Sequence, residues 1–234
     1  MAQVIQKSSN VGAAKIALSL PPEMMWDMFH SVGFGTQPQL GFPGEATGRV
    51  RPVKTWKPIE QATMAYGHGI SVSLMQLARA YSIFARDGEL MPTSLLRLDS
   101  APPAQRIIAP ETARAVRAML EMAVQPGGTA PRAQIMGYRV AGKTGTAHKQ
   151  ENGGYSHNKY VSSFVGYAPA SSPRLIVAVM IDEPSAGQYY GGAVAAPVFA
   201  KVMEGALRTL GVPPDAPMKP IQLPAAGQEV KESI

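Results

Sequence analysis

Three extended segments in the second half of the chain constrain the fold more than any other feature. They read GYRVAGKTG (137–145), KYVSSFVGYAP (159–169) and RLIVAVMID (174–182), and they carry the β-branched and aromatic residues that favour strands. The connections at 153–154 and 170–173 are short, so neighbouring strands should run antiparallel. We therefore predict an α+β fold, in which an antiparallel meander is covered on one face by a closing helix over 193–211. That helix should direct these apolar side chains at the sheet: Val194, Val198, Phe199, Val202, Met203 and Leu207.

Helical spacing and capping residues place the remaining elements. Helices are predicted over 8–20, 23–32, 73–88 and 109–124, and a long loop rich in glycine and proline over 33–58. Three strands make a narrow sheet for so many helices. We therefore expect the fold to be incomplete at its N-terminal side.

Composition and spacing argue against several kinds of function. The 234 residues include no cysteine, which removes disulfide and thiolate chemistry. The net charge is +6, but the sequence contains no long run of basic residues, which disfavours nucleic acid as a partner. The four histidines are not spaced as metal ligands, and we predict neither a metal nor a cofactor. The apolar run over 175–181 is far shorter than the roughly 18 residues of a membrane span.

The first of the three strands carries Lys-Thr-Gly-Thr, residues 143–146, where we expect it to end. The motif offers an ammonium and two hydroxyls, while Gly145 leaves room for a substrate backbone along the strand edge. The N–H of Thr146 could point at a developing oxyanion, and the hydroxyls of Thr144 and Thr146 could hold a carboxylate. These residue types are common, so the motif alone does not distinguish a functional site from a chance match.

A second motif, Ser-x-Asn at Ser8 and Asn10, opens the first predicted helix. The plain interpretation is a helix N-cap. The functional interpretation is a serine that relays a proton beside an amide that binds a substrate carbonyl. In the order S-x-N and then K-T-G, the two motifs match the later motifs of the penicillin-recognising serine enzymes.

The chain resembles the C-terminal part of the transpeptidase domain of class B penicillin-binding proteins, and most of all the septal, division-specific type. Besides the two motifs, the resemblance rests on AYGHGISVSLMQLARAYSIFARDG, QPGGTAPRA, KYVSSFVGYAPA and YYGGAVAAPVFAKVMEGAL, which occur in the family's order. It covers residues 2–212 and implies the penicillin-binding, serine β-lactamase-like fold, an antiparallel sheet flanked by helices. We assign residues 1–212 to this domain and 213–234 to a flexible, proline-rich tail.

The resemblance implies a role for each matched residue. Ser8 would sit near the nucleophile and join proton transfer to the leaving amine, and Asn10 would bind the amide of the acyl donor. Lys143 would stabilise Ser8 and help to set the electric field of the site. Thr144 and Thr146 would hold the carboxylate of a terminal D-alanine or a β-lactam. Gly145 would let the substrate approach, and the N–H of Thr146 would form half of the oxyanion hole. Tyr189 and Tyr190 would wall the pocket, although a packing role fits them equally well.

One departure from the family concerns the nucleophile. Family members carry S-x-x-K before S-x-N, and no such motif precedes Ser8 in this sequence. The match at Ser156–Lys159 follows K-T-G-T and lies beside a predicted turn, so we interpret it as a coincidence. We expect the nucleophile serine to be absent from this chain, which would then be inactive alone.

For the intact protein, the resemblance implies peptidoglycan stem peptides and β-lactams as ligands and other division proteins as partners. It also implies a membrane anchor in an absent N-terminal segment, at the periplasmic face of the bacterial inner membrane. Two alternatives stay open. A serine β-lactamase would need a deacylating base, and Glu45, Glu60 and Glu89 lie between the motifs without a recognisable context. A non-catalytic module would use the strand edge to bind a peptide.

Overall fold

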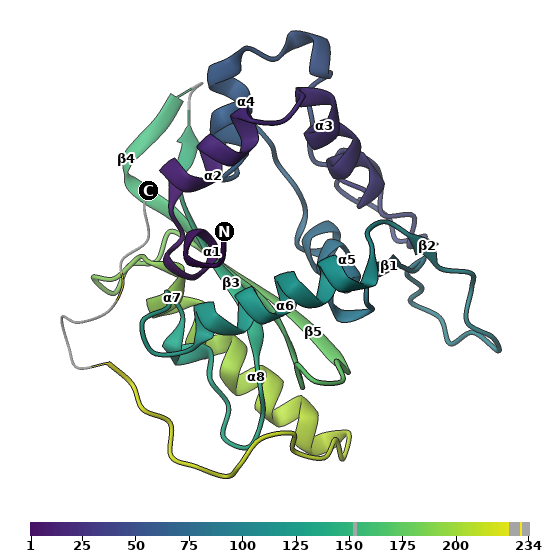
Figure 1. Cartoon of the computed structure of the whole chain (residues 1–234), viewed down its shortest axis with the longest axis vertical. Helices are drawn as coiled ribbons and strands as arrows, with labels where there is room; N and C mark the ends of the chain where they lie inside the picture. Colours follow the sequence, from purple (N-terminus) through teal and green to yellow (C-terminus); the bar gives the residue numbers. More distant parts are fainter. Residues whose placement is uncertain (152–153, 225–229, 231–234) are drawn as a thin grey trace. The chain divides into compact units, whose positions relative to one another are not determined.

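The computed structural model describes residues 1–151, 154–224 and 230. It divides into two compact units, one made of Met1–Ser9 with Arg114–Ile234 and the other of Asn10–Ala113. The chain runs from the first unit into the second and back (Figure 1). The domain boundaries assigned above stay a prediction.

The first unit is built on the predicted meander. Strands β3 (Ala141–Glu151), β4 (Gly154–Ala168) and β5 (Leu175–Asp182) form an antiparallel sheet in the order β3-β4-β5. The first strand was predicted too early. Gly137, with a φ of 83°, lies in a turn in which the N–H of Tyr138 donates to the carbonyl of Ile135, and so the strand begins at Ala141. Lys143–Thr146 therefore lies near the start of β3, which is an edge strand of this sheet.

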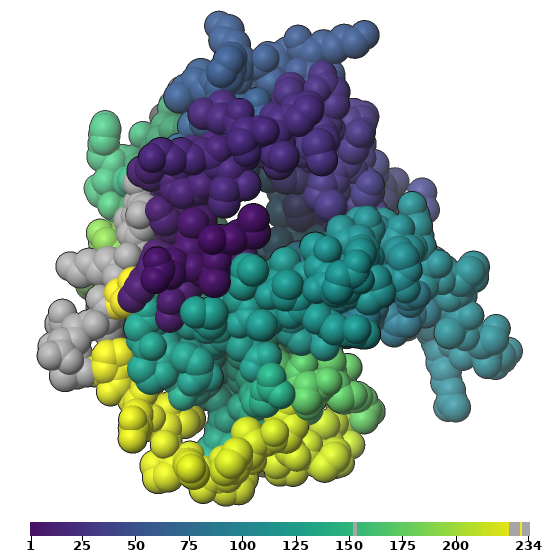
Figure 2. Space-filling model, viewed as in Figure 1, coloured from purple at the N-terminus to yellow at the C-terminus, as the bar shows by residue number. Residues whose placement is uncertain are grey.

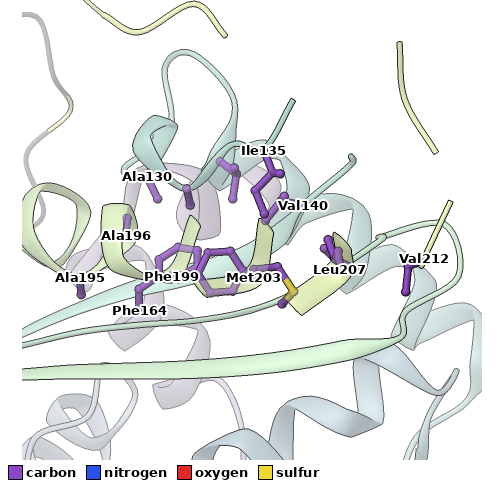
Figure 3. Close-up of a cluster of buried hydrophobic side chains, with 13 residues drawn as sticks. Ala130, Ile135, Val140, Phe164, Ala195, Ala196, Phe199, Met203, Leu207 and Val212 are labelled. Carbon is purple, nitrogen blue, oxygen red and sulfur yellow. The ribbon is translucent and has the colours of Figure 1, made fainter. Parts of the chain in front are cut away.

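Helix α8 (Ala196–Thr209) packs on one face of the sheet. Phe199 and Met203 are fully buried and point toward Phe164 of β4, whose ring centroid lies 4.6 Å from that of Phe199 (Figure 3). The expectation for Val198 and Val202 was wrong, because they are 40% and 50% exposed. Each lies one position before a buried residue, which is about 100° around the helix axis, so its side chain points away from the buried stripe.

The predicted closing helix is interrupted near its start. Residues Gly191–Val194 form a separate turn, α7, and α8 follows with Pro197 in its first turn. Proline is tolerated there because it lacks only an N–H that the helix would not use.

The first unit contains three further elements. They are α1 (Ala2–Lys7), the C-terminal part of α6 (Pro110–Val124) and the short 3₁₀ helix η2 (Pro131–Ala133). Neither α1 nor η2 was predicted.

The start of the assigned tail is hydrogen bonded to this unit. The N–H groups of Asp215 and Ala216 donate to the carbonyl of Gly137, and the carboxylate of Asp215 accepts from the N–H of Arg139 and from Ser171. In Figure 2 the yellow C-terminal segment accordingly lies against teal residues of the same unit. Residues 225–229 and 231–234 of the tail lie outside the described residues, and its flexibility stays a prediction.

The second unit is mostly helical. Its helices are α2 (Asn10–Leu18), α3 (Pro22–Ser31), η1 (Val53–Thr55), α4 (Pro58–Met64) and α5 (Leu74–Ala85). A hairpin of β1 (Glu89–Leu90) and β2 (Gln105–Arg106) follows. Neither α4 nor this hairpin was predicted.

Gln76 organises the long loop over 33–58. Its side chain is 2% exposed, and its Nε2 donates to the carbonyls of Gly33, Thr36 and Thr47 at 2.7–3.1 Å. Its Oε1 accepts from the N–H of Ser73. One buried amide therefore ties three points of the loop to α5.

Within the described part of the chain, no helix is long and apolar enough to cross a membrane. In the same residues, no group of three or more histidine, aspartate or glutamate side chains is arranged to hold a metal ion.

Candidate active site

Two of the predicted catalytic residues, 135 positions apart in sequence, meet in the first unit. Lys143 Nζ donates to Ser8 Oγ at 2.9 Å, and both side chains are partly buried. Ser8 follows the last residue of α1 and has a left-handed backbone, with a φ of 54° and a ψ of 49°. Non-glycine residues in this region cost about 1 kcal/mol or more, and such residues cluster at functional sites. Ser8 was predicted at the start of a helix, whereas it ends one.

The ammonium of Lys143 also contacts the next residue. Its Nζ donates to the carbonyl oxygen of Thr144 at 3.2 Å and to Thr144 Oγ1 at 3.1 Å. An ammonium has three donors, so it can serve Ser8 and both oxygens of Thr144 at once. Its position is therefore fixed by its own strand and by α1 together.

Thr144 has a further partner that was not predicted from the sequence. Its side chain is buried, and its Oγ1 lies 2.9 Å from Thr129 Oγ1, which is also buried. Thr129 lies in QPGGTAPRA, a stretch that was used above only as part of the family resemblance. The contact depends on tertiary packing between two segments, and no local pattern predicts it.

Thr146 contacts the turn that follows the two tyrosines. The N–H of Gly191 donates to Thr146 Oγ1 at 2.9 Å. A Cβ at Gly191 would lie only 2.8 Å from the carbonyl oxygen of Gly145, so α7 and β3 approach as closely as they do because residue 191 has no side chain.

Gly145 itself has a packing reason to be glycine. A Cβ there would lie 2.7 Å from Ser163 Oγ on β4. This packing role does not exclude the other role proposed for Gly145, which is to let a substrate backbone approach. That role stays a prediction.

A row of four aromatic rings includes His148 of this strand. The rings of Tyr160 and Tyr189 are stacked, parallel within 9° at a centroid distance of 4.0 Å, and Tyr190 and His148 contact the two ends of this pair at tilts of 34° and 39°. Burial, together with Tyr189, raises the pKa of the Tyr160 phenol above its usual 10.0. The predicted role of Tyr189 and Tyr190 as pocket walls stays a prediction. Tyr160 and His148 were not named from the sequence, because their place beside these rings depends on strand register.

Asn10 is the first residue of α2 and belongs to the second unit. Its role toward an acyl donor stays a prediction. The predicted group therefore has Ser8, Lys143, Thr144, Gly145, Thr146, Tyr189 and Tyr190 in the first unit and Asn10 in the second.

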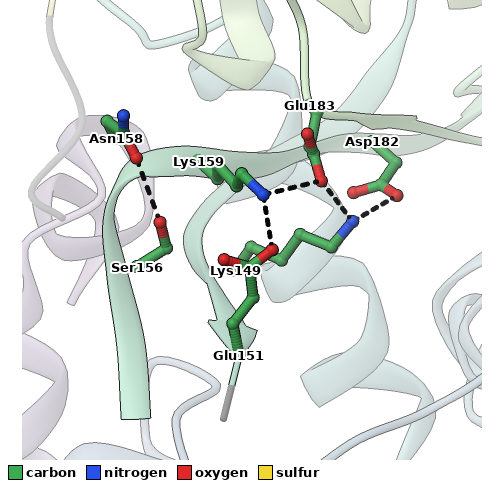
Figure 4. Close-up of polar contacts among 7 residues, drawn as sticks. All are labelled: Lys149, Glu151, Ser156, Asn158, Lys159, Asp182 and Glu183. Atoms are coloured by element: carbon green, nitrogen blue, oxygen red, sulfur yellow. Dashed lines mark hydrogen bonds and ion pairs between the residues drawn. The ribbon is translucent and has the colours of Figure 1, made fainter.

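The second S-x-x-K match lies in β4, away from any helix start. Residues three apart on a strand point to opposite faces, whereas on a helix they share one. Ser156 Oγ donates to Asn158 Oδ1, and Lys159 Nζ donates to Glu151 Oε1 at 2.7 Å (Figure 4). This geometry agrees with our interpretation of the match as a coincidence.

Lys149 belongs to the same charged cluster. Its Nζ contacts Asp182 at 2.8 Å and Glu183 at 2.7 Å, and the hydrogen bonds to these two carboxylates raise the pKa of Lys149 (Figure 4). The cluster ties β3 to the end of β5 across β4.

The three glutamates between the motifs each have a local partner. Glu45 accepts from the N–H groups of Gln39 and Phe42, Glu60 pairs with Arg51 at 2.7 Å, and Glu89 pairs with Arg106 at 2.7 Å. These contacts give each carboxylate a structural role within the second unit.

Comparison with known proteins identifies the family. Residues 1–204 match the model of the penicillin binding protein transpeptidase domain. The chain is 48% identical over 215 residues to a probable peptidoglycan D,D-transpeptidase PenA of Neisseria flavescens, a match that covers 92% of this chain and 54% of that protein. It is 43% identical over 213 residues to the peptidoglycan D,D-transpeptidase FtsI of Escherichia coli K12, which covers 91% of this chain and 36% of that protein.

A solved structure supports the same family assignment as these relatives. The apo structure of the transpeptidase domain of Burkholderia pseudomallei penicillin-binding protein 3 superposes with a TM-score of 0.88 at 54% identity, over 92% of this chain and 66% of that one. The chain belongs to the penicillin-binding protein transpeptidase domain family. The resemblance to the class B, division-specific type and the predicted α+β fold class are both confirmed, and the chain spans about half or less of the length of the curated relatives named here.

Proposed function

We propose that this chain is the C-terminal part of the transpeptidase domain of a peptidoglycan D,D-transpeptidase that cross-links stem peptides at the division septum. The observation that carries the proposal is the 2.9 Å contact between Lys143 Nζ of the K-T-G motif and Ser8 Oγ of the S-x-N motif. The names of its relatives PenA and FtsI support the same activity.

In the proposed reaction, a serine oxygen attacks the carbonyl of the penultimate D-alanine and forms an acyl-enzyme ester as the C–N bond breaks. The terminal D-alanine leaves after its amine gains a proton, and the proton that the attacking serine releases replaces the one passed to the amine. Ser8 is suited to deliver that proton. Because Ser8 Oγ accepts from Lys143, its own hydroxyl proton points elsewhere and can be passed to the leaving nitrogen. Asn10 would hold the amide of the acyl donor.

Lys143 adds a positive charge beside the reacting atoms. An ammonium about 4 Å from a developing negative charge is worth a few kcal/mol at a moderate effective dielectric. It would stabilise both the deprotonated nucleophile and the tetrahedral intermediate, while the N–H of Thr146 would supply one half of the oxyanion hole.

Thr146 would bind the substrate carboxylate with Thr144. The N–H of Gly191 donates to Thr146 Oγ1 at 2.9 Å, which holds this hydroxyl oxygen beside the turn at Gly191. Gly145 would keep the approach along the strand open, and Tyr189 and Tyr190 would wall the pocket.

The nucleophile belongs, in this proposal, to an S-x-x-K segment outside these 234 residues, and the chain alone is inactive. The intact protein would be anchored in the inner membrane with this domain at its periplasmic face, where it would act with other division proteins on peptidoglycan and be inhibited by β-lactams.

Labelling with a fluorescent penicillin tests the proposal in a longer protein that contains this chain and its upstream S-x-x-K segment. A stable adduct on the upstream serine is expected. Rapid loss of the label would instead indicate a β-lactamase, and no label on the longer protein would indicate a peptide-binding module. Label mapped to Ser8 or Ser156 of the 234-residue chain would contradict the assignment of the nucleophile.

A further inference from the structure

Ser162 is a fully buried polar residue of β4 that the proposed reaction does not use. It is 0% exposed, and its hydroxyl donates to the carbonyl oxygen of Tyr189. The direction of this bond is determined, because a carbonyl oxygen can only accept. A buried hydroxyl needs a partner, and among the described residues the carbonyl of Tyr189 is the hydrogen-bond partner of Ser162.

The neighbour of Ser162 in the sheet holds the same segment of chain. Ser162 of β4 lies directly opposite Thr146 of β3, and opposite residues of an antiparallel pair share one face of the sheet. The hydroxyl of Ser162 binds the carbonyl of Tyr189, while Thr146 Oγ1 accepts from the N–H of Gly191 at 2.9 Å. Residues 189–191 are therefore fixed at two points to two neighbouring strands.

The ring of Tyr189 is held from the same face of the sheet. Tyr160 lies two positions before Ser162 in β4, so the two side chains point to the same side. The ring of Tyr160 stacks on that of Tyr189 at a centroid distance of 4.0 Å. The side chain and the main chain of Tyr189 thus each have a contact on β4.

The loop that leads into this segment has few other attachments to the sheet. The N–H of Glu183 donates to a carbonyl of β4. Among the described residues, the backbone of 184–188 then forms no hydrogen bond. The bond from Ser162 is therefore the first attachment of the main chain after Glu183, and without it the chain before Gly191 would be free to move.

We propose that Ser162 is a positioning residue of the active site, which holds residues 189–191 against the sheet through the carbonyl of Tyr189. The inference rests on the proposed function, in which Thr146 binds the substrate carboxylate and the tyrosine rings wall the pocket. Ser162 fixes the place of the Tyr189 ring and of the Gly191 N–H that contacts Thr146. It acts through these groups and carries no chemistry of its own.

The substitution Ser162→Ala tests the inference in the 234-residue chain itself, because it removes the hydroxyl and adds no atoms. Ser171→Ala is the matched control, since it removes one hydroxyl hydrogen bond, to Asp215, in the turn after β4. The readout is the exchange of the Gly191 amide proton with water, measured by NMR. The buried Phe199 amide of α8 is the reference, because a general loss of stability would raise both rates.

In Ser162→Ala the Gly191 amide should exchange about fivefold faster than in the parent chain, because opening of the segment no longer breaks a bond of ordinary strength. The reference amide should change by less than about twofold. The nuclear Overhauser effect between the rings of Tyr160 and Tyr189 should weaken, and the control variant should keep both readouts. Equal exchange of the Gly191 amide in Ser162→Ala and in the parent would overturn the inference.

A second measurement decides if Ser162→Ala does not fold. In the unsubstituted chain, the hydroxyl proton of Ser162 should be visible by NMR and protected from exchange, because it is donated to a carbonyl in a buried place. A Ser162 hydroxyl proton that exchanges as fast as those of exposed serines would overturn the inference.

Acylation of the longer protein by a penicillin gives a readout that a loss of stability alone would not produce. Ser162→Ala should weaken the non-covalent affinity about fivefold, because Thr146 loses its fixed place at the carboxylate. The rate constant of acylation should stay within about twofold, because the N–H of Thr146 belongs to β3, which stays paired with β4. Ser171→Ala should leave both values unchanged.

Unchanged affinity in Ser162→Ala, in a longer protein that is acylated, would overturn the inference. If the unsubstituted longer protein is not acylated, the proposed function fails, and the exchange measurement still decides whether Ser162 positions residues 189–191.

Discussion

The substitution Gly191→Ala should destabilise the protein by an amount that the packing around α7 determines. Gly191 is buried, and a methyl group there would overlap with the carbonyl oxygen of Ser163 and lie 2.8 Å from that of Gly145. Both are backbone atoms of paired strands and cannot turn aside. Overpacking of this kind costs about 1–3 kcal/mol. The shift of α7 would also weaken the bond from the Gly191 N–H to Thr146, which is worth about 1 kcal/mol.

The expected loss is thus about 2–4 kcal/mol, or about 5–15 °C in Tm for a protein of this size. Gly205→Ala is the matched control. Gly205 lies inside α8, and a Cβ added there would meet nothing within 4 Å, so alanine should stabilise the helix by about 0.5–1 kcal/mol. Urea unfolding at equal m-value measures both variants. A Gly191→Ala protein as stable as its parent would refute the close packing of α7 against β3.

Three further outcomes are expected. Asp215→Ala should lower the free energy of unfolding by about 1–3 kcal/mol in urea, because the N–H of Arg139 loses its acceptor, and an unchanged value would count against an anchored segment. Gln76→Ala should cost about 2–4 kcal/mol and raise amide exchange across 33–58, whereas unchanged exchange would show that the loop is held by other contacts. Tyr160 should titrate above pH 10.0, since burial and Tyr189 raise its pKa. Absorbance at about 295 nm should show that the titration step lost in Tyr160→Phe lies above pH 10, and a lost step near pH 10 would contradict this.

The sheet and its covering helix could be predicted because their signals are local. Strand composition, short connections and the spacing of Phe199, Met203 and Leu207 all lie within a few residues of one another. The limits of β3 could not be predicted in the same way, since they depend on the turn at Gly137 and on pairing with β4. Val198 and Val202 were misplaced because apolar residues on both sides of a helix leave its buried face ambiguous.

The candidate site likewise contains residues that local motifs predict and residues that only tertiary contacts reveal. Ser8, Lys143 and Thr146 could be named from motifs, because their residue types and order are specific in combination. Thr129 and Tyr160 contribute through contacts between segments distant in sequence, and no spacing rule marks them. The left-handed backbone of Ser8 was also missed, since a serine before a helical pattern is typical of an N-cap, whereas here it ends α1.

The most direct test of the account compares two lysines of the same strand in the longer protein with its upstream serine. Lys143→Ala removes the ammonium that contacts Ser8, whereas Lys149→Ala removes one that pairs with Asp182 and Glu183. The measurement is the second-order rate constant of acylation by a fluorescent penicillin. We predict a loss of about 10²-fold or more for Lys143→Ala and a change within about threefold for Lys149→Ala. Equal rates for the two variants, both close to that of the parent protein, would contradict the central claim that the Ser8–Lys143 contact marks the active site.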